Sequence, residues 1–254
     1  LFRADAWPHI VLAERRLFCK DRNGNLKCLV VGEAAKLARA DSPKKQPSLR
    51  PPPSTYIEKP INLTTWPGTA GLLLAWKAGY SDRRVIGYRD GEKHSWSAVL
   101  TGDAKHDSRA GFSLAGGSCR IEAANGPLLT ALREANELTI ELVLTSDNAR
   151  QAGPARIISF SSDPYHRNFT LGQERGHFVL RLRTPSTGEN GQRPEVTLCR
   201  VAPEKSQHVI VSYRNGHLAT YLDGKLASQS SDIRGDFRNW TRQHFLLGDE
   251  HDGG

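Results

Sequence analysis

The stretch from His208 to Leu226 constrains the fold of this chain more than any other. Apolar and polar residues alternate along it, and the dipeptides Asn215-Gly216 and Asp223-Gly224 interrupt the alternation. Alternation with a period of two is typical of a half-buried strand. Both dipeptides tolerate the positive φ that a tight hairpin turn needs. The stretch therefore predicts three short antiparallel strands in succession.

Similar strands are predicted along the whole chain after Gly71. Many short strands separated by Gly, Asn and Pro indicate a sandwich, and a hydrophobic content of 38% suits sheets with one wet face. We expect an all-β fold, a two-sheet antiparallel jelly-roll sandwich, with a short helix over 126–136. The predicted strands are 71–76, 84–88, 95–100, 111–115, 118–122, 137–145, 155–161, 168–173, 177–184, 194–201, 207–214, 217–222, 225–230 and 244–248.

Residues 1–42 predict a small extension made of a hairpin and a short helix, the helix over 33–40. A two-residue turn at Asn23-Gly24 would place Cys19 directly opposite Cys28. That pair would be a non-hydrogen-bonded one, in which side chains lie close enough to form a disulfide. We therefore expect a Cys19–Cys28 disulfide and an oxidising compartment. Two reduced cysteines are the alternative.

Residues 43–68 predict an extended linker, because seven prolines exclude both a helix and a central strand. The expected domains are thus the extension at 1–42, the linker at 43–68 and the sandwich at 69–254. The linker either bridges two domains or lies along the surface of a partner.

The net charge of +8 is concentrated in residues 1–67, which hold 12 Lys and Arg against 6 Asp and Glu. Such a segment suits a membrane surface, an acidic protein or nucleic acid, or is simply a solvated arm. Aromatic residues are not interleaved with the basic ones as single-strand binders require, so we expect no nucleic-acid partner. No apolar run approaches the roughly 18 residues of a membrane span.

Several linked segments of 71–254 resemble laminin-G-like domains, within the concanavalin A-like jelly-roll superfamily, and the branch found in bacterial envelope proteins is similar. The resemblance implies a binding role outside the cytoplasm, in the periplasm or cell envelope. Family members continue into one more closing strand after the segment matching 245–250, so we expect an open sheet edge there or a chain that continues. The segments carrying the resemblance are 137–144, 155–163, 168–173, 178–184, 221–225 and 245–250.

Some relatives in this superfamily hydrolyse glycosides with a pair of carboxylates about 5–5.5 Å or 6.5–9.5 Å apart. Glu137 and Glu141 share a strand face, but four residues along a strand span roughly 13 Å. Motifs of other hydrolases and phosphate-cradling loops are lacking. We therefore expect a protein that is not an enzyme.

Two loops carry the residues best suited to a ligand. The loop at 162–168 joins two predicted core strands, and the long loop at 184–194 is expected to neighbour it. An aromatic platform beside polar donors suits a sugar, although such residues can also just hold the turn. The candidate ligand-binding residues are Asp163, Tyr165, His166, Arg167, Glu189 and Asn190.

The acidic, glycine-rich segment at 248–254 is the candidate metal site. Asp249, Glu250 and Asp252 offer the hard oxygen ligands that calcium prefers, and a frayed chain end is the alternative. Cys119 and Cys199 are expected to be buried thiols.

Together these features predict a non-catalytic, extracytoplasmic binding module for a glycan or a protein. One alternative is a structural accessory subunit that docks on a membrane-associated complex through residues 1–67. A second alternative is a divergent glycoside hydrolase.

Overall fold

The structure is a computed structural model. It describes the strands at 11–13, 16–20 and 26–30 and residues 71–76, 84–89, 92–107 and 110–250. The chain divides into two compact units, Leu1–Thr69 and Ala70–Gly254. The predicted helix at 33–40 and the proline-rich linker at 43–68 lie outside the described residues.

The first unit contains a three-stranded antiparallel sheet in the order β1 (Val11–Ala13), β2 (Arg16–Lys20) and β3 (Leu26–Val30). The predicted hairpin is confirmed as β2 and β3, whereas β1 was not predicted. The last pair of these two strands is Lys20 with Leu26.

The pairing register of β2 and β3 differs by one residue from the register that was predicted. Cys19 pairs with Lys27, and Cys28 pairs with Phe18. A shift of one residue moves a strand's side chains to the other face of the sheet. The direct pairing on which the Cys19–Cys28 disulfide prediction rests is therefore wrong.

The second unit consists of strands β4 to β19, the 3-10 helix η2 and the helix α1. Their bounds are β4 (Leu74–Ala75), β5 (Arg84–Arg89), β6 (Glu92–Ser97), β7 (Val99–Gly102), β8 (Lys105–Asp107), β9 (Gly111–Ser113), β10 (Gly117–Arg120), η2 (Glu122–Ala124), α1 (Asn125–Ala135), β11 (Glu137–Thr145), β12 (Ala155–Ser161), β13 (Arg167–Glu174), β14 (His177–Leu182), β15 (Val196–Arg200), β16 (Ser206–Arg214), β17 (His217–Leu222), β18 (Lys225–Ser230) and β19 (His244–Leu247).

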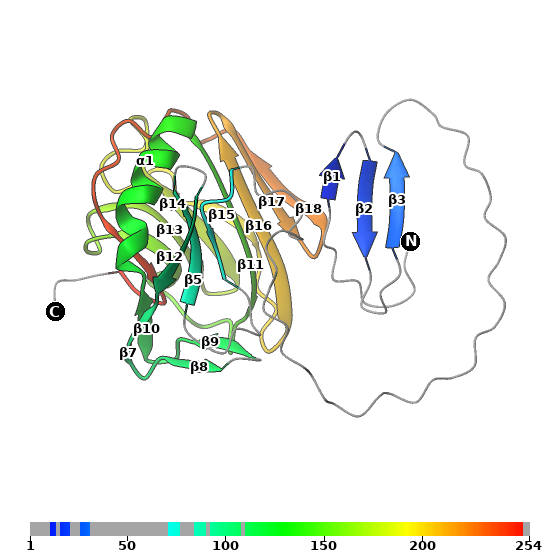
Figure 1. The fold of residues 1–254 in the computed structure, drawn as a ribbon. Helices are drawn as coiled ribbons and strands as arrows, with labels where there is room; N and C mark the ends of the chain where they lie inside the picture. Colours follow the sequence, from blue (N-terminus) through cyan, green and yellow to red (C-terminus); the bar gives the residue numbers. More distant parts are fainter. Residues whose placement is uncertain are drawn as a thin grey trace, which may run out of the picture. The chain divides into compact units, whose positions relative to one another are not determined.

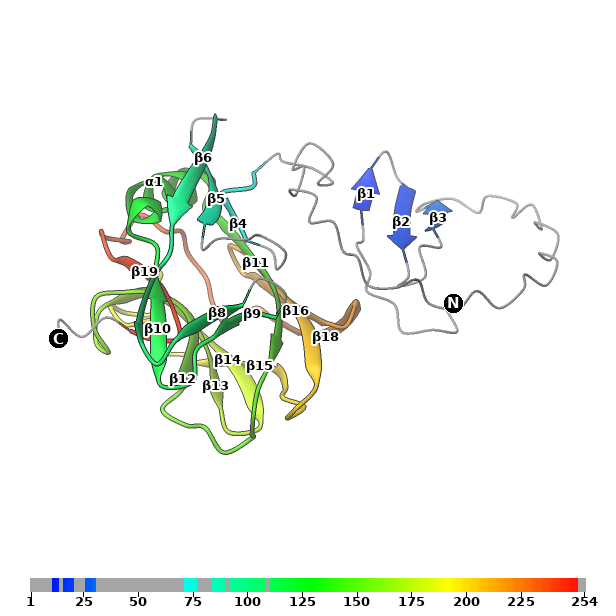
Figure 2. The same cartoon turned by 60° about the horizontal axis from the view of Figure 1, so that its bottom comes forward.

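These strands build a β-sandwich of two larger antiparallel sheets (Figures 1 and 2). One sheet has seven strands in the order β15-β14-β13-β12-β19-β10-β7, and the other has four in the order β11-β16-β17-β18. Two small sheets, β4-β5-β6 and β8-β9, are also present. The expected all-β, two-sheet antiparallel architecture is confirmed. The strand predicted at 95–100 is two strands, because β6 ends at Ser97 and β7 begins at Val99.

The core lies between the two sheets. Along β11, Leu138, Ile140, Leu142 and Leu144 pack on the core while the alternate residues are exposed, which is the alternation that predicted this strand. The opposite sheet contributes buried aromatic rings. The segment after β18 adds Phe237 and Trp240, whose rings stack with centroids 4.2 Å apart. The buried aromatic rings of the two sheets are Phe160, Phe169, Phe178, Tyr213 and Phe245.

The strand β19 lies inside the seven-stranded sheet and pairs with neighbours on both sides. It pairs with β12 through Phe160↔Phe245 and with β10 through Cys119↔Leu247. The open edge expected beside this strand is therefore wrong, because β10 and β7, which come earlier in the chain, fill the position. Among the described residues, no helix is long and apolar enough to span a membrane.

Candidate functional site

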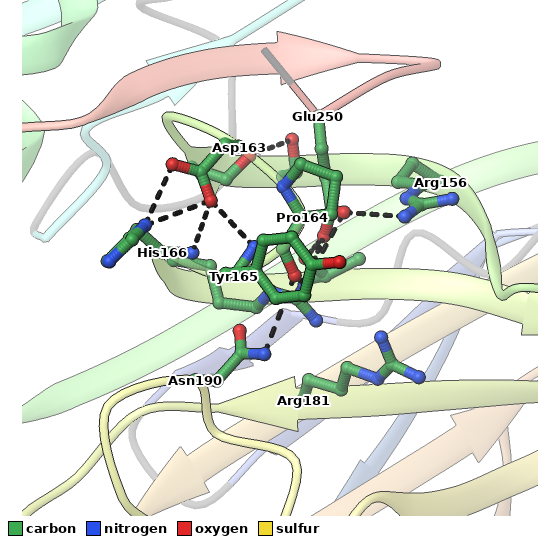
Figure 3. Close-up of polar contacts among 12 residues, drawn as sticks. Arg156, Asp163, Pro164, Tyr165, His166, Arg181, Asn190 and Glu250 are labelled. Atoms are coloured by element: carbon green, nitrogen blue, oxygen red, sulfur yellow. Dashed lines mark hydrogen bonds and ion pairs between the residues drawn. The ribbon is translucent and has the colours of Figure 1, made fainter. Parts of the chain in front are cut away.

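The loop between β12 and β13 presents an exposed aromatic ring at its tip. Tyr165 is 75% exposed, whereas the strands on either side are largely buried. Asp163 fixes the turn that carries this ring. Its Oδ1 accepts hydrogen bonds from the backbone N–H groups of Tyr165, at 2.6 Å, and His166, at 2.8 Å. The ring is therefore held outward by a short, internally bonded turn (Figure 3).

The same carboxylate interacts with the imidazole of His166, whose Nδ1 lies 2.8 Å from Asp163 Oδ2. Burial alone would raise the pKa of Asp163. The N–H groups of Tyr165 and His166 and the His166 ring outweigh it, and the pKa lies below its ordinary value. Asp163 thus holds the turn, which is the alternative role given for this loop in the sequence analysis.

Arg167 is not at the ligand-facing surface where we predicted it. Its side chain is fully buried, and Nη2 donates to the backbone oxygen of Pro164 and lies 3.2 Å from Glu250 Oε1. Burial lowers the pKa of Arg167 to about 10, an effect that Arg181 and Arg156 reinforce and Glu250 opposes. The guanidinium therefore stays charged at neutral pH beneath the loop.

The loop at 184–194 meets the Tyr165 loop, because Asn190 Nδ2 lies 3.5 Å from the backbone oxygen of Pro164 (Figure 3). The Oδ1 atom of Asn190 is buried and has no hydrogen-bond partner among the described residues. Glu189 precedes it and is exposed. The structure thus brings Asn190 to the base of the loop that carries Tyr165.

Two of the three predicted calcium ligands, Asp249 and Glu250, have other partners among the described residues. Both oxygens of Glu250 face guanidinium groups, Oε2 at 2.7 Å from Arg156 Nη2 and Oε1 at 3.2 Å from Arg167 Nη2. Two arginines beside this carboxylate disfavour a divalent cation by charge repulsion, so the assignment of Glu250 to a calcium site is wrong. Asp249 uses its backbone oxygen to accept from Ser159, and Asp252 lies outside the described residues.

Within the described part of the chain, no group of three His, Cys, Asp or Glu residues could hold a metal ion. Cys119 and Cys199 are buried thiols, as expected. Burial raises the pKa of Cys199 to about 11, and Asp223 adds to the effect. This thiol therefore stays protonated at neutral pH and is a poor nucleophile.

The sequence interpretation missed four residues beneath the loop. Outward positions on three adjacent strands place Ser159, Thr170 and Arg181 in one row, since Thr170 pairs with both of the others. Arg181 Nε donates to Glu195 Oε2 at 2.6 Å. The sequence signal that could have identified this row was Arg181, which stands between Leu180 and Leu182 in a strand with one buried face. The missed residues are Arg156, Ser159, Thr170 and Arg181.

A shallow depression of about 390 Å³ lies elsewhere, against α1. Its lining contains none of the candidate ligand-binding residues, and it is widely open to solvent. The residues that line it are Leu129, Thr130, Arg133, Glu134 and Arg238.

No protein-family model matches this sequence, and no curated protein matches it significantly. The chain is similar to domain 4 of an extracellular GH43 arabinanase from Geobacillus stearothermophilus, solved with arabinotriose, at 12% identity and a TM-score of 0.40, over 61% of this chain and 74% of that chain.

It is also similar to the receptor-binding domain of a botulinum neurotoxin C/D mosaic serotype, at 14% identity and a TM-score of 0.41, over 67% of this chain and 48% of that chain. A Trypanosoma rangeli sialidase variant matches at 13% identity and a TM-score of 0.37, over 67% of this chain and 25% of that chain. Likenesses this distant assign no function to the chain, and the function has to be inferred from the site.

Proposed function

We propose that the second unit is a non-catalytic carbohydrate-binding module and that it binds its glycan on the ring of Tyr165. The observation that carries the proposal is the 75% exposure of this ring on a loop that Asp163 holds in place. Large aromatic rings are normally buried in soluble proteins. A ring fixed in an exposed position is already arranged to stack on a sugar, with little entropy left to lose on binding.

The polar groups around Tyr165 suit hydroxyl groups. His166 is exposed beside it, and Asn190, at the base of the loop, has a buried carbonyl oxygen with no hydrogen-bond partner among the described residues. One aromatic surface with a few polar groups around it is the usual composition of a small-molecule or sugar site.

The same surroundings support binding without catalysis. Glycoside hydrolysis needs two carboxyl groups that face the substrate. The carboxylate of Asp163 is used by the turn, and that of Glu250 is engaged by two arginines. We include in the proposal that the unit is laminin-G-like and acts outside the cytoplasm, on the basis of the sequence segments that resemble this family.

Replacing Tyr165 tests the proposal. A glycan array with the full chain first identifies the ligand, and calorimetric titration then measures the affinity of Tyr165→Ala. We expect a loss of about tenfold or more, because the stacking surface is removed, and a much smaller loss for Tyr165→Phe, which keeps the ring.

Tyr221→Ala is the matched control. Tyr221 is an exposed aromatic residue on β17 of the other sheet, at 37% exposure, so its loss should leave the affinity unchanged. The proposal is wrong if Tyr165→Ala binds like the native chain, if Tyr221→Ala loses as much, or if only protein ligands bind.

A further inference from the structure

The segment after β19 brings a carboxylate onto the outer face of the seven-stranded sheet. Ser159 Oγ donates to the backbone oxygen of Asp249 at 2.5 Å, which lays the segment across β12. The side chain of the next residue, Glu250, is only 1% exposed. A carboxylate is seldom buried so completely unless partners compensate its charge.

Three side chains from two adjacent strands provide this compensation. Glu250 Oε2 lies 2.7 Å from Arg156 Nη2 on β12. Its Oε1 accepts from Thr170 Oγ1 at 2.7 Å and lies 3.2 Å from Arg167 Nη2, both on β13. Two guanidinium groups and a hydroxyl that converge on one carboxylate are a recognition geometry for carboxylates in general.

The arginines offer more donors than Glu250 uses. The Nε and Nη1 atoms of Arg167 and the Nε atom of Arg156 are buried and have no hydrogen-bond partner among the described residues. Buried donors without partners are costly and uncommon in folded proteins. The cluster therefore has unused capacity to bind oxygen atoms of an anionic ligand.

This cluster contacts the loop that carries the aromatic ring proposed to bind the sugar. Arg167 follows Tyr165 by two residues and donates to Pro164 of the same loop. Figure 3 shows the polar contacts of this loop together with the ion pair of Glu250 and Arg156. A saccharide on Tyr165 would thus lie on a loop whose backbone Arg167 binds directly.

We infer that Arg156, Arg167 and Thr170 form a binding site for the carboxylate of an acidic sugar, such as a uronic acid, and that Glu250 occupies this site while no ligand is bound. The sugar carboxylate replaces that of Glu250, and the sugar ring stacks on Tyr165. This inference rests on the proposed function and adds the chemical class of the ligand.

The exchange is physically reasonable because one carboxylate takes the place of another. Removing Glu250 without replacement would leave the fully buried Arg167 and the partly buried Arg156 without their carboxylate, which is unfavourable. A tethered competitor acts at an effective concentration on the order of millimolar. Glu250 therefore lowers the apparent affinity for acidic sugars and favours ligands that also gain from stacking.

Glucuronate binding to the full chain and to two variants tests the inference. Glu250→Gln keeps the size of the side chain without its charge, and Glu250→Ala removes the competitor. Calorimetry should show each variant binding glucuronate about tenfold or more tightly than the native chain. Glucose serves as the neutral sugar, and acetate at matched ionic strength serves as the simple anion.

Hydrogen exchange of the native chain gives a second readout that does not depend on the stability of a variant. Saturating glucuronate should increase exchange at residues 248–250, because the segment is released, and glucose should not. The inference is wrong if glucuronate leaves these amides protected, or if both folded variants bind it no better than the native chain does. Equal binding of acetate and glucuronate, or binding of a glutamate-containing peptide but not of glucuronate, would also overturn it.

The Tyr165→Ala variant separates this inference from the proposed function. If glucuronate still releases residues 248–250 in Tyr165→Ala with undiminished affinity, the carboxylate site is real and the stacking platform is not. If neutral glycans bind through Tyr165 while Glu250 never leaves, the proposed function holds and the carboxylate exchange fails.

Discussion

At the loop that carries Tyr165, a single ionised side chain holds the backbone. The pKa of Asp163 is lower in the folded protein than its ordinary value of about 4, so folding favours the ionised form. The hydrogen bonds that this carboxylate accepts therefore stabilise the turn fully when the pH is above the ordinary pKa. They are lost as the pH falls through the lower, folded-state pKa.

We expect the change in the NMR chemical shifts of the Tyr165 and His166 amide protons that reports on the Asp163 carboxylate to have its midpoint below pH 4. The backbone N–H of Arg150 is the internal control, because it donates at 2.8 Å to the neutral side chain of Asn148 in a similar turn. Asp163→Asn should abolish the titration. A midpoint above pH 4 in the native chain would contradict the lowered pKa.

The sequence predicted the exposed aromatic residue and its turn, because both depend on neighbours within a few residues. It did not predict that Arg167 is buried. The partner that allows this burial, Glu250, lies 83 positions further along the chain, and no local pattern indicates which distant segment will cover a given strand face. The residues beneath the loop were missed for the same reason.

At the scale of single elements, the alternation of apolar and polar residues was a reliable guide wherever one sheet face is buried. It predicts β11, β12, β17 and β18 with the bounds that the structure has. It does not give the register between β2 and β3, because alternation alone does not determine which residues of two strands face each other. It also missed β8, which is only three residues long.

Two turn glycines allow a direct test of how much the backbone conformation contributes. Gly216, between β16 and β17, has a φ of +72° and open space around its Cα, whereas Gly176, between β13 and β14, has equal space but no positive φ. We expect Gly216→Ala to lower the free energy of unfolding by about 1 kcal/mol and Gly176→Ala to change it by less than about 0.5 kcal/mol.

Denaturant-induced unfolding of the full chain measures both variants. Because neither added methyl group meets another atom within 4 Å, a difference between them reports on φ alone. Equal destabilisation of the two variants would show that the turn at Gly216 adapts without strain.

At the scale of the whole molecule, the described core of the sandwich is built from residues of the second unit, including Phe169, Tyr213 and Trp240. We therefore expect residues 70–254 alone to unfold cooperatively and to bind the glycan with the affinity of the full chain. Circular dichroism during heating and calorimetric titration measure the two properties.

Loss of glycan binding in this shorter chain, while it stays folded, would contradict the binding-module proposal. Binding of the full chain to a membrane-associated complex that requires residues 1–67 would favour the accessory-subunit hypothesis instead. The net charge of these residues makes such binding salt-dependent, so its loss at high ionic strength is the control.

The position of β19 has a consequence for folding of the chain during its synthesis. During synthesis, β12 to β15 emerge from the ribosome after β7 and β10, but the strand that joins the two groups comes only near residue 244. Until then both groups present an unpaired edge, which is a template for association with other chains. A nascent chain of this topology therefore exposes these edges to association with other chains until β19 has been made.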